Sequence, residues 1–282
     1  MSTRPLKFGL TLLGLNSVPE MVVEAQRAEA AGFDVILLPD HLGFTAPLTP
    51  LIALAQAAPT VKVSNLVLNA SFYRPALLAR DLASVDSATG GRLIISLGTG
   101  YVEQEFVAAG IPFPSPGARV KIVAEHISEL RRLLSDPSHI PAPVQTPPPI
   151  MVAAQGDKML TLAAQQADIV AIALMGNEAD LAARVAFVKD KAGDRFADIE
   201  LQFGFFQVSM DDPSDLSVIR LLEPDAPEEE VRKLTTVLDV PVSAAAERIQ
   251  RLHEELGISY FSLNKTAGTS WDTLEKLISA LR

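Results

Sequence analysis

Eight short apolar runs alternate with helical patterns along this chain, and this alternation constrains the fold more than any other feature of the sequence. The expected strands cover residues 7–13, 33–38, 61–69, 92–101, 150–154, 168–173, 199–208 and 258–263. The expected helices cover residues 18–31, 47–58, 75–88, 117–134, 158–167, 179–191, 243–256 and 270–281. Repeated βα units favour a parallel sheet, and eight of them close into a barrel. Because the length of 282 residues is near the ~250 typical of such barrels, we expect one α/β domain, a (β/α)8 TIM barrel, spanning residues 1–282.

The composition restricts the classes of function that such a barrel could have. No cysteine is present, which excludes disulfides, thiolate catalysis and cysteine-ligated metals. The four histidines lack an HExxH or other paired spacing, so no metal site is expected. A net charge of -10 disfavours nucleic acid as a partner, because binding it requires a basic face. The first residues, MSTRPLK, are not followed by a signal-peptide pattern, and FGLTLLGL is too short to span a bilayer, so we expect a cytoplasmic protein without membrane contact.

A barrel of this kind carries its active site at the carboxyl ends of its strands, so the residues that follow each strand are the candidates for function. Polar groups and glycines gather there: Asp40-His41, Asn69-Ala70-Ser71, Gly98-Thr99-Gly100, Gln155-Gly156, Met175-Gly176-Asn177, Gln207 and Asn264-Lys265. The glycines after the fourth strand would let the backbone approach a ligand and turn N–H groups toward an anion. A plain βα turn also accounts for these glycines, and strand ends are often polar simply because they meet water. Both interpretations stay open.

Several segments near these strand ends are typical of a known family. They are PDH after the second strand, VLNASFYRP at the third, DLASVDSATGGRLIISLGTGYVEQEF through the fourth, residues 119–125 of the next helix, and PPIMVAAQGDKMLTLAAQQAD around the fifth. On these motifs the chain resembles the bacterial luciferase-like superfamily, and within it the branch that uses the deazaflavin coenzyme F420. The resemblance covers nearly the whole chain. It implies a luciferase-like TIM barrel with the deazaflavin ring in its mouth.

The resemblance also implies roles for particular residues. Asp40 and His41 would lie beside the ring, where His41 could act as acid or base because an imidazole titrates near ~6.5. A histidine held only for structure is the alternative. Asp40 would orient the histidine, meet the pyrimidine edge of the ring, or cap the following turn. The other expected cofactor contacts are Leu66 and Val67, at a non-proline cis peptide bond, together with Asn69, Gly98, Thr99, Gly100, Ala154, Gln155 and Gly156.

Two departures from the family pattern bear on the ligands. Where relatives have a Gly-Gly pair after the fifth strand, this chain has Gln155-Gly156 followed by Asp157. That carboxylate would repel a phosphate unless it is turned back as a helix cap. Where the sugar-phosphate dehydrogenases of the branch have an acidic residue after the strand-four glycines, this chain has Tyr101, a hydrogen-bond donor and a poor base at neutral pH. Tyr101 is thus the second candidate catalytic residue, and a phosphosugar substrate is not expected.

Three hypotheses for function remain open at this point. The first is a coenzyme F420-dependent oxidoreductase that transfers a hydride between the deazaflavin and a small organic substrate and forms a homodimer. The second is a luciferase-like monooxygenase that uses reduced FMN and oxygen; the short chain favours the first over the second. The third is a non-catalytic deazaflavin-binding barrel. A short insertion after the seventh strand, residues 209–230, is either a lid or a solvated acidic segment.

Overall fold

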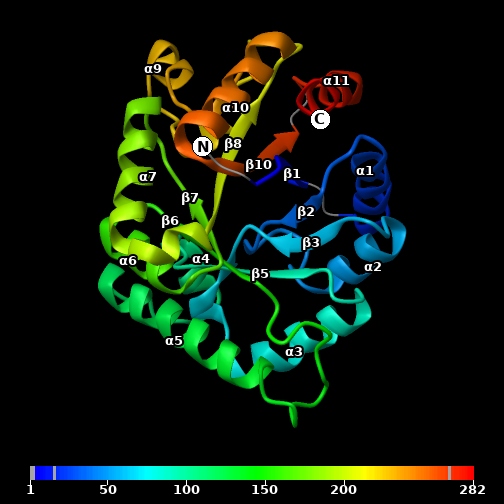
Figure 1. The fold of residues 1–282 in the computed structure, drawn as a ribbon, viewed down its shortest axis with the longest axis vertical. Helices are drawn as coiled ribbons and strands as arrows, with labels where there is room; N and C mark the ends of the chain where they lie inside the picture. Colours follow the sequence, from blue (N-terminus) through cyan, green and yellow to red (C-terminus); the bar gives the residue numbers. More distant parts are fainter. Residues whose placement is uncertain (1–3, 15–16, 266–267) are drawn as a thin grey trace.

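The computed structural model describes residues 4–14, 17–265 and 268–282, and its parallel strands form a closed barrel surrounded by helices (Figure 1). The strands are β1 (Lys7–Thr11), β2 (Val35–Leu38), β3 (Lys62–Asn65), β4 (Leu68–Asn69), β5 (Leu93–Gly98), β6 (Ile150–Ala154), β7 (Ile169–Ile172), β8 (Glu200–Val208), β9 (Val237–Leu238) and β10 (Ile258–Lys265). Neighbours pair in the order β10-β1-β2-β3-β5-β6-β7-β8, and β8 pairs with β10 to close the ring. The predicted (β/α)8 barrel is confirmed.

Side chains along each strand alternate between the outside and the inside of the barrel, so apolar residues form one cluster against the helices and another in the barrel interior. On β1, Phe8 and Leu10 belong to the large apolar cluster between strands and helices. Gly9 faces the interior, where Leu37 and Tyr260 lie so close that a side chain would not fit. The interior cluster consists of Val35, Leu37, Ile94, Met151, Ile169, Ala171 and Tyr260. Since successive residues point to opposite faces, the residues that end the strands on the inner face form the floor of the mouth.

Helices follow the strands close to where the sequence predicts them. They are α1 (Val18–Ala30), α2 (Thr49–Ala57), α3 (Pro75–Ala88), α4 (Glu103–Ala108), α5 (Pro116–Leu134), α6 (Asp157–Gln166), α7 (Glu178–Ala192), α8 (Ile219–Leu222), α9 (Glu228–Arg232), α10 (Val242–Leu256) and α11 (Trp271–Leu281). The ends carry the expected signals: Asn177 and Asp180 form a capping box at α7, and α10 stops at Gly257 with φ of 74°. Within the described ranges, no helix is long and apolar enough to cross a membrane.

The third strand is interrupted, in contrast to the continuous strand expected over residues 61–69. The Leu66-Val67 peptide bond between β3 and β4 is cis, at the position that the family resemblance implied. The pairing of β3 and β4 with β5 leaves one residue more on the β3–β4 side than on β5. The extra residue makes a bulge, and bulges are a common way to redirect side chains at a barrel rim.

The segment after β8 is folded against the barrel. It carries α8, α9 and β9, and Leu216, Ile219, Val231 and Val237 form an apolar cluster of their own. The buried amide of Gln207 accepts two hydrogen bonds from backbone N–H groups of this segment and donates one to a backbone carbonyl. A purely solvated insertion does not fit this anchoring, whereas the lid interpretation of residues 209–230 stays a prediction.

Candidate active site

The loop after β2 is tied to the end of β4 by the side chain of Asp40. Its Oδ2 atom accepts hydrogen bonds from the backbone N–H of Asn69 (2.9 Å) and from the hydroxyl of Tyr73 (3.1 Å). Burial raises the pKa of the Asp40 carboxyl, while these two hydrogen bonds favour the charged form and oppose the rise. Burial likewise raises the pKa of Tyr73, which therefore remains a donor. Neither hydrogen bond reaches His41, so the Asp40 side chain fixes the loop and acts on the adjacent histidine through its charge.

The imidazole of His41 is held on three sides. Its Nδ1 lies 2.7 Å from Oε1 of Glu105, and the rings of Phe44 and Tyr101 pack nearly perpendicular to it, with centroids 5.8 Å and 5.9 Å away. The His41 side chain is 30% exposed and that of Glu105 is 15% exposed. In the part of the chain that the structure describes, Nε2 has no hydrogen-bond partner. This nitrogen is therefore the one available to a ligand.

Glu105 is a site residue that the sequence patterns did not single out. It lies on α4, and the next residue, Phe106, is fully buried. Phe106 packs against Phe72 and Phe113 with ring centroids 5.1 Å and 4.9 Å away. This aromatic anchor fixes the short helix and with it the carboxylate. The EF pair that ends the GTGYVEQEF motif was the available signal, but the histidine partner lies 64 positions away in the chain.

Gly98 and Gly100 are required by the wall of the mouth itself. A Cβ on Gly98 would overlap with Cγ2 of Val67, and a Cβ on Gly100 would overlap with the side chain of Asn69. Gly100 also has φ of 66°, in the left-handed region that glycine adopts without strain. The glycines thus let the bulged β3–β4 segment lie against the end of β5. This contact brings together four of the predicted cofactor-binding residues, with Thr99 between the two glycines.

The remaining predicted residues are placed differently. Leu66 packs against the interior cluster, whereas Ala154 is buried in the cluster between strands and helices, so its side chain points away from the mouth. Gln155 and Gly156 are exposed at the start of α6, and neither is among the hydrogen-bond or ring partners of the imidazole within the described residues. Asp157 does not cap α6; it pairs with Arg184 on α7 at 2.5 Å, which offsets its charge.

The rim of the mouth is apolar and aromatic. Leu42, Phe44 and Tyr101 expose 50%, 36% and 64% of their surfaces. Partial desolvation and the nearby Glu105 carboxylate raise the pKa of Tyr101, so its phenol is a hydrogen-bond donor at neutral pH and not a base. Exposed apolar groups gathered at one place are a common feature of surfaces that bind ligands or other proteins.

Three buried hydroxyl groups at the carboxyl ends of strands lack a hydrogen-bond partner among the residues that the structure describes. They are Oγ1 of Thr11, which ends β1 on its inner face, Oγ of Ser71, which follows β4, and Oγ of Ser209, which follows β8. A buried polar atom without a partner is destabilising by roughly 1–3 kcal/mol. A polar atom of a ligand at the mouth would remove this cost.

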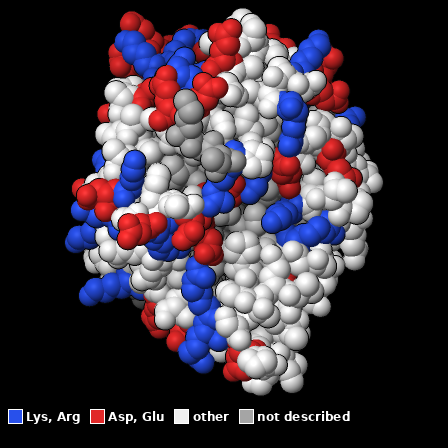
Figure 2. Space-filling model, in the orientation of Figure 1, with Lys and Arg blue, Asp and Glu red and all other residues white. Residues whose placement is uncertain are grey.

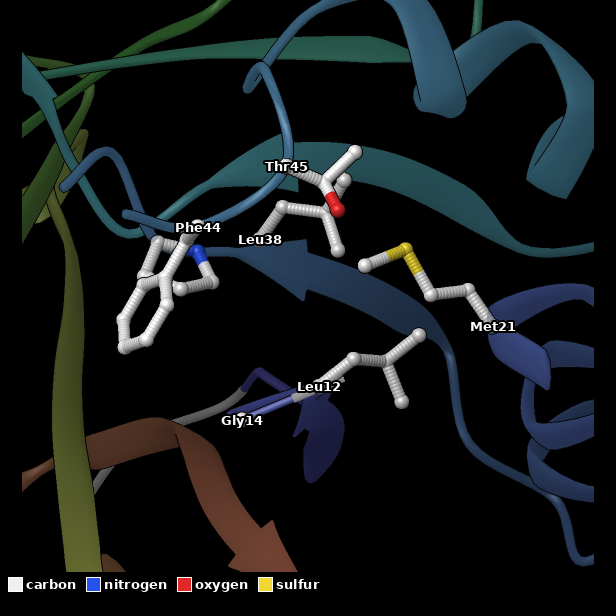
Figure 3. Close-up of a pocket in the computed structure, with 7 residues that line it drawn as sticks. Leu12, Gly14, Met21, Leu38, Phe44 and Thr45 are labelled. Atoms are coloured by element: carbon white, nitrogen blue, oxygen red, sulfur yellow. The ribbon is translucent and has the colours of Figure 1, made fainter. Parts of the chain in front are cut away.

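A small apolar pocket lies on the outer side of the rim (Figure 3). Leu12 directly follows β1 and Leu38 ends β2, Met21 projects from α1, and Phe44 lies on the side opposite Met21. Because Leu12, Leu38 and Met21 belong to the cluster between strands and helices, the pocket borders the mouth and does not open into the barrel. Phe44 is shared between this pocket and the ring contact with the histidine.

Charged side chains of both signs are mixed over the face of the molecule seen in Figure 2. Lysine and arginine do not form a continuous basic surface on that face.

The family model of the luciferase-like monooxygenases matches residues 6–221, a span that contains seven of the eight barrel positions. The chain belongs to the luciferase-like monooxygenase family. This family membership agrees with the resemblance inferred from the strand-end motifs.

Characterised relatives of this family member include two kinds of enzyme. The chain is 30% identical over 184 residues to 5,10-methylenetetrahydromethanopterin reductase of Archaeoglobus fulgidus, which covers 59% of this chain and 53% of the reductase. It is 30% identical over 123 residues to F420-dependent glucose-6-phosphate dehydrogenase of Amycolatopsis mediterranei, covering 40% of this chain and 37% of that enzyme. The chain therefore matches about half the length of the reductase and less of the dehydrogenase.

Solved structures share the whole fold at low identity. An F420-dependent secondary alcohol dehydrogenase in complex with an F420-acetone adduct has a TM-score of 0.81 and 18% identity, with 99% of this chain and 100% of that chain covered. The long-chain alkane monooxygenase LadA has a TM-score of 0.78 and 16% identity, with coverage of 99% and 91%. At these identities the likeness shows the fold, which a dehydrogenase and a monooxygenase have in common.

Proposed function

We propose that this luciferase-like protein binds coenzyme F420 at the carboxyl ends of its barrel strands and transfers a hydride between the deazaflavin and a small, uncharged organic substrate. The observation that carries the proposal is the environment of His41. Its Nδ1 is engaged by Glu105, and its Nε2 has no hydrogen-bond partner among the described residues, while Tyr101, which directly follows the glycine turn, packs against the same ring. The two characterised relatives, one a reductase and one an F420-dependent dehydrogenase, support this assignment.

The residues at the mouth fit a deazaflavin ring. The half-buried Val67 and the interior-facing Leu66 offer an apolar surface for a ring face. The partnerless hydroxyls of Thr11 and Ser71 offer hydrogen bonds to the polar edges of a heteroaromatic ring. At the start of α6, the exposed Gly156 has open space where a side chain would be, which leaves room for an anionic tail beside the N-terminus of the helix.

The chemistry divides between the cofactor and the protein. F420, when bound, supplies a carrier that takes up or gives a hydride. His41 handles the accompanying proton: during substrate oxidation, Nε2 accepts the proton of the atom bonded to the carbon that loses hydride, and during reduction Nε2–H returns it. Tyr101, protonated at neutral pH, donates a hydrogen bond to the same substrate atom. Electrons and protons thus balance in both directions.

The rim indicates which substrates are accepted. Leu42, Phe44 and Tyr101 favour an apolar group, and the carboxylates of Asp40 and Glu105 disfavour an anion. The substrate is therefore a small neutral molecule and not a phosphosugar, although one relative acts on glucose 6-phosphate.

A binding titration of the purified protein with F420 and with FMN, followed by ring fluorescence, tests the proposal. F420 should bind with a Kd at or below about 1 μM, roughly -8 kcal/mol, and FMN at least about tenfold more weakly. Selective binding of FMN would overturn the cofactor assignment and favour the monooxygenase hypothesis. Binding of neither would remove the basis for an oxidoreductase.

Turnover separates the enzyme from a non-catalytic deazaflavin-binding barrel. Neutral alcohols, ketones and enones are screened with oxidised and reduced F420, and the change in deazaflavin absorbance reports hydride transfer. The variant His41→Gln should lower kcat by about 10²–10⁴-fold, the usual contribution of a general acid or base. His139→Gln, in the loop between α5 and β6, is the matched control and should not. Tight F420 binding with equal rates for all three proteins would contradict the role of His41.

A further inference from the structure

We propose that Glu105 is a positioning residue: it holds His41 in the neutral tautomer that carries its proton on Nδ1, so that Nε2 is the nitrogen which exchanges a proton with the substrate. The inference rests on the proposed function for the existence of that substrate. The tautomer itself is a property of the protein and can be measured without cofactor or substrate.

The geometry decides which nitrogen donates. Nδ1 of His41 lies 2.7 Å from Oε1 of Glu105, which is the length of a strong, charge-assisted hydrogen bond. An ionised carboxylate has acceptor oxygens and no proton to give, so the nitrogen facing it must carry the hydrogen. The other ring nitrogen of the neutral imidazole is then an acceptor, and it is the one that has no partner among the described residues.

The surroundings leave Glu105 as the group that fixes the ring. The carboxylate of Asp40 is adjacent in sequence, but its Oδ2 is occupied by Asn69 and Tyr73. Tyr101 and Phe44 contact the imidazole through their rings, which restrict its tilt but do not choose between the two nitrogens. Among the described residues, the Glu105 carboxylate is thus the polar group in contact with the imidazole.

The position of Glu105 is itself well determined. Its side chain is only 15% exposed, and the neighbouring Phe106 locks the six-residue helix between two further aromatic rings. A carboxylate on such an anchored helix holds one rotamer, in contrast to a carboxylate on a mobile surface loop. In serine proteases, where an aspartate holds a catalytic histidine in the same manner, loss of the correct tautomer lowers kcat about 10⁴-fold.

The experiment compares imidazole ¹⁵N spectra of the protein without cofactor, recorded with rising pH until the His41 signals no longer change, so that the neutral ring is the form observed. His41→Gln identifies the His41 signals by their absence. In the wild type, Nδ1 should show the shift of a protonated nitrogen and Nε2 that of an unprotonated one. In Glu105→Gln this preference should be lost or reversed, because an amide can either donate or accept. Glu103→Gln removes the same charge from an exposed position two residues earlier on α4 and should leave the wild-type pattern unchanged.

The outcomes separate this inference from the proposed function. A wild-type His41 protonated on Nε2, or a tautomer that Glu105→Gln leaves unaltered, would overturn the positioning role even if F420 binds. Failure of F420 to bind would overturn the proposed function while the tautomer stands. Where both hold, F420 should bind to Glu105→Gln within about threefold of wild type, and kcat should fall by about 10-fold or more with KM little changed.

Discussion

Replacing Gly98 with alanine should destabilise the protein through a single steric contact. The added Cβ would overlap with Cγ2 of Val67, whereas the nearest backbone atom, the carbonyl oxygen of Leu68, is 4.0 Å away. Gly98 is not among the glycines with positive φ, so backbone conformation adds no cost. Inserting a methyl group into a packed wall costs about 1–3 kcal/mol. In a protein of this size each kcal/mol lowers the melting midpoint by roughly 2–4 °C.

A double-mutant cycle isolates that contact. Val67→Ala removes the atom that alanine at position 98 would strike, at a cost of about 1 kcal/mol for two methyl groups on a half-buried side chain. The double variant should therefore be about 1–2 kcal/mol more stable than the two single effects predict. Gly156→Ala is the steric control: no atom lies within 4 Å of its added Cβ, so its stability should fall only by the roughly 0.5–1 kcal/mol that alanine costs at this helix N-cap.

Urea and thermal unfolding of the five proteins, followed by circular dichroism, give the required free energies. Two results would refute the reasoning. One is a Gly98→Ala protein within about 0.5 kcal/mol of wild type, and the other is a cycle that is simply additive. Either result would mean that Val67 in the bulge does not pack against Gly98 at the end of β5. The proposed ring site would then not be bounded by this contact.

Asp40→Asn should flatten the pH dependence of the free energy of unfolding. Burial raises the pKa of the Asp40 carboxyl in the folded state above the ordinary 3.8. The carboxyl therefore stabilises the folded state fully below pH 3.8, and this contribution is lost as the pH rises through the folded-state pKa. Urea midpoints from acid to neutral pH should fall less in the variant, and parallel curves would contradict this. Arg92→Met should lower the free energy of unfolding in urea by at least about 3 kcal/mol. The guanidinium donates hydrogen bonds to four backbone carbonyls, two of them near the end of α2. A decrease below about 1 kcal/mol would be inconsistent with those bonds. Gln207→Leu should speed amide hydrogen exchange in residues 209–240 and leave β1 to β3 unchanged, because it removes the three hydrogen bonds that anchor the segment; unaltered exchange would show that the apolar cluster alone holds it.

The limits of prediction from sequence are clearest at the third strand. Residues 61–69 have an apolar pattern that fits one strand, yet β3 and β4 are separated at Leu66-Val67. Hydrophobic alternation does not reveal a bulge, because one extra residue changes the pairing register without changing the composition. The short elements α4, α8, α9 and β9 were missed for a related reason, since two to six residues are too few to establish a period.

The candidate site was predicted in part. Strand ends correctly located Asp40 and Asn69, which the structure joins by a hydrogen bond, and His41 with Tyr101, which it brings into ring contact. The same reasoning placed Ala154 at the mouth, although its side chain lies on the outer side of the wall. A position at the end of a strand tells which edge of the sheet a residue lies on, but not whether its side chain points into the barrel or outward. The direction of the side chain depends on the strand register at that residue.

The sequence by itself determined the barrel, the edge that carries the candidate site and the absence of cysteine chemistry, because apolar periodicity is local and parallel strands bring their carboxyl ends to one rim. Only the tertiary structure decided which groups touch. Glu105 meets His41 across 64 positions, and Val67 explains why position 98 is glycine. Such contacts depend on the packing of distant segments against one another, which a local pattern of residue types does not encode.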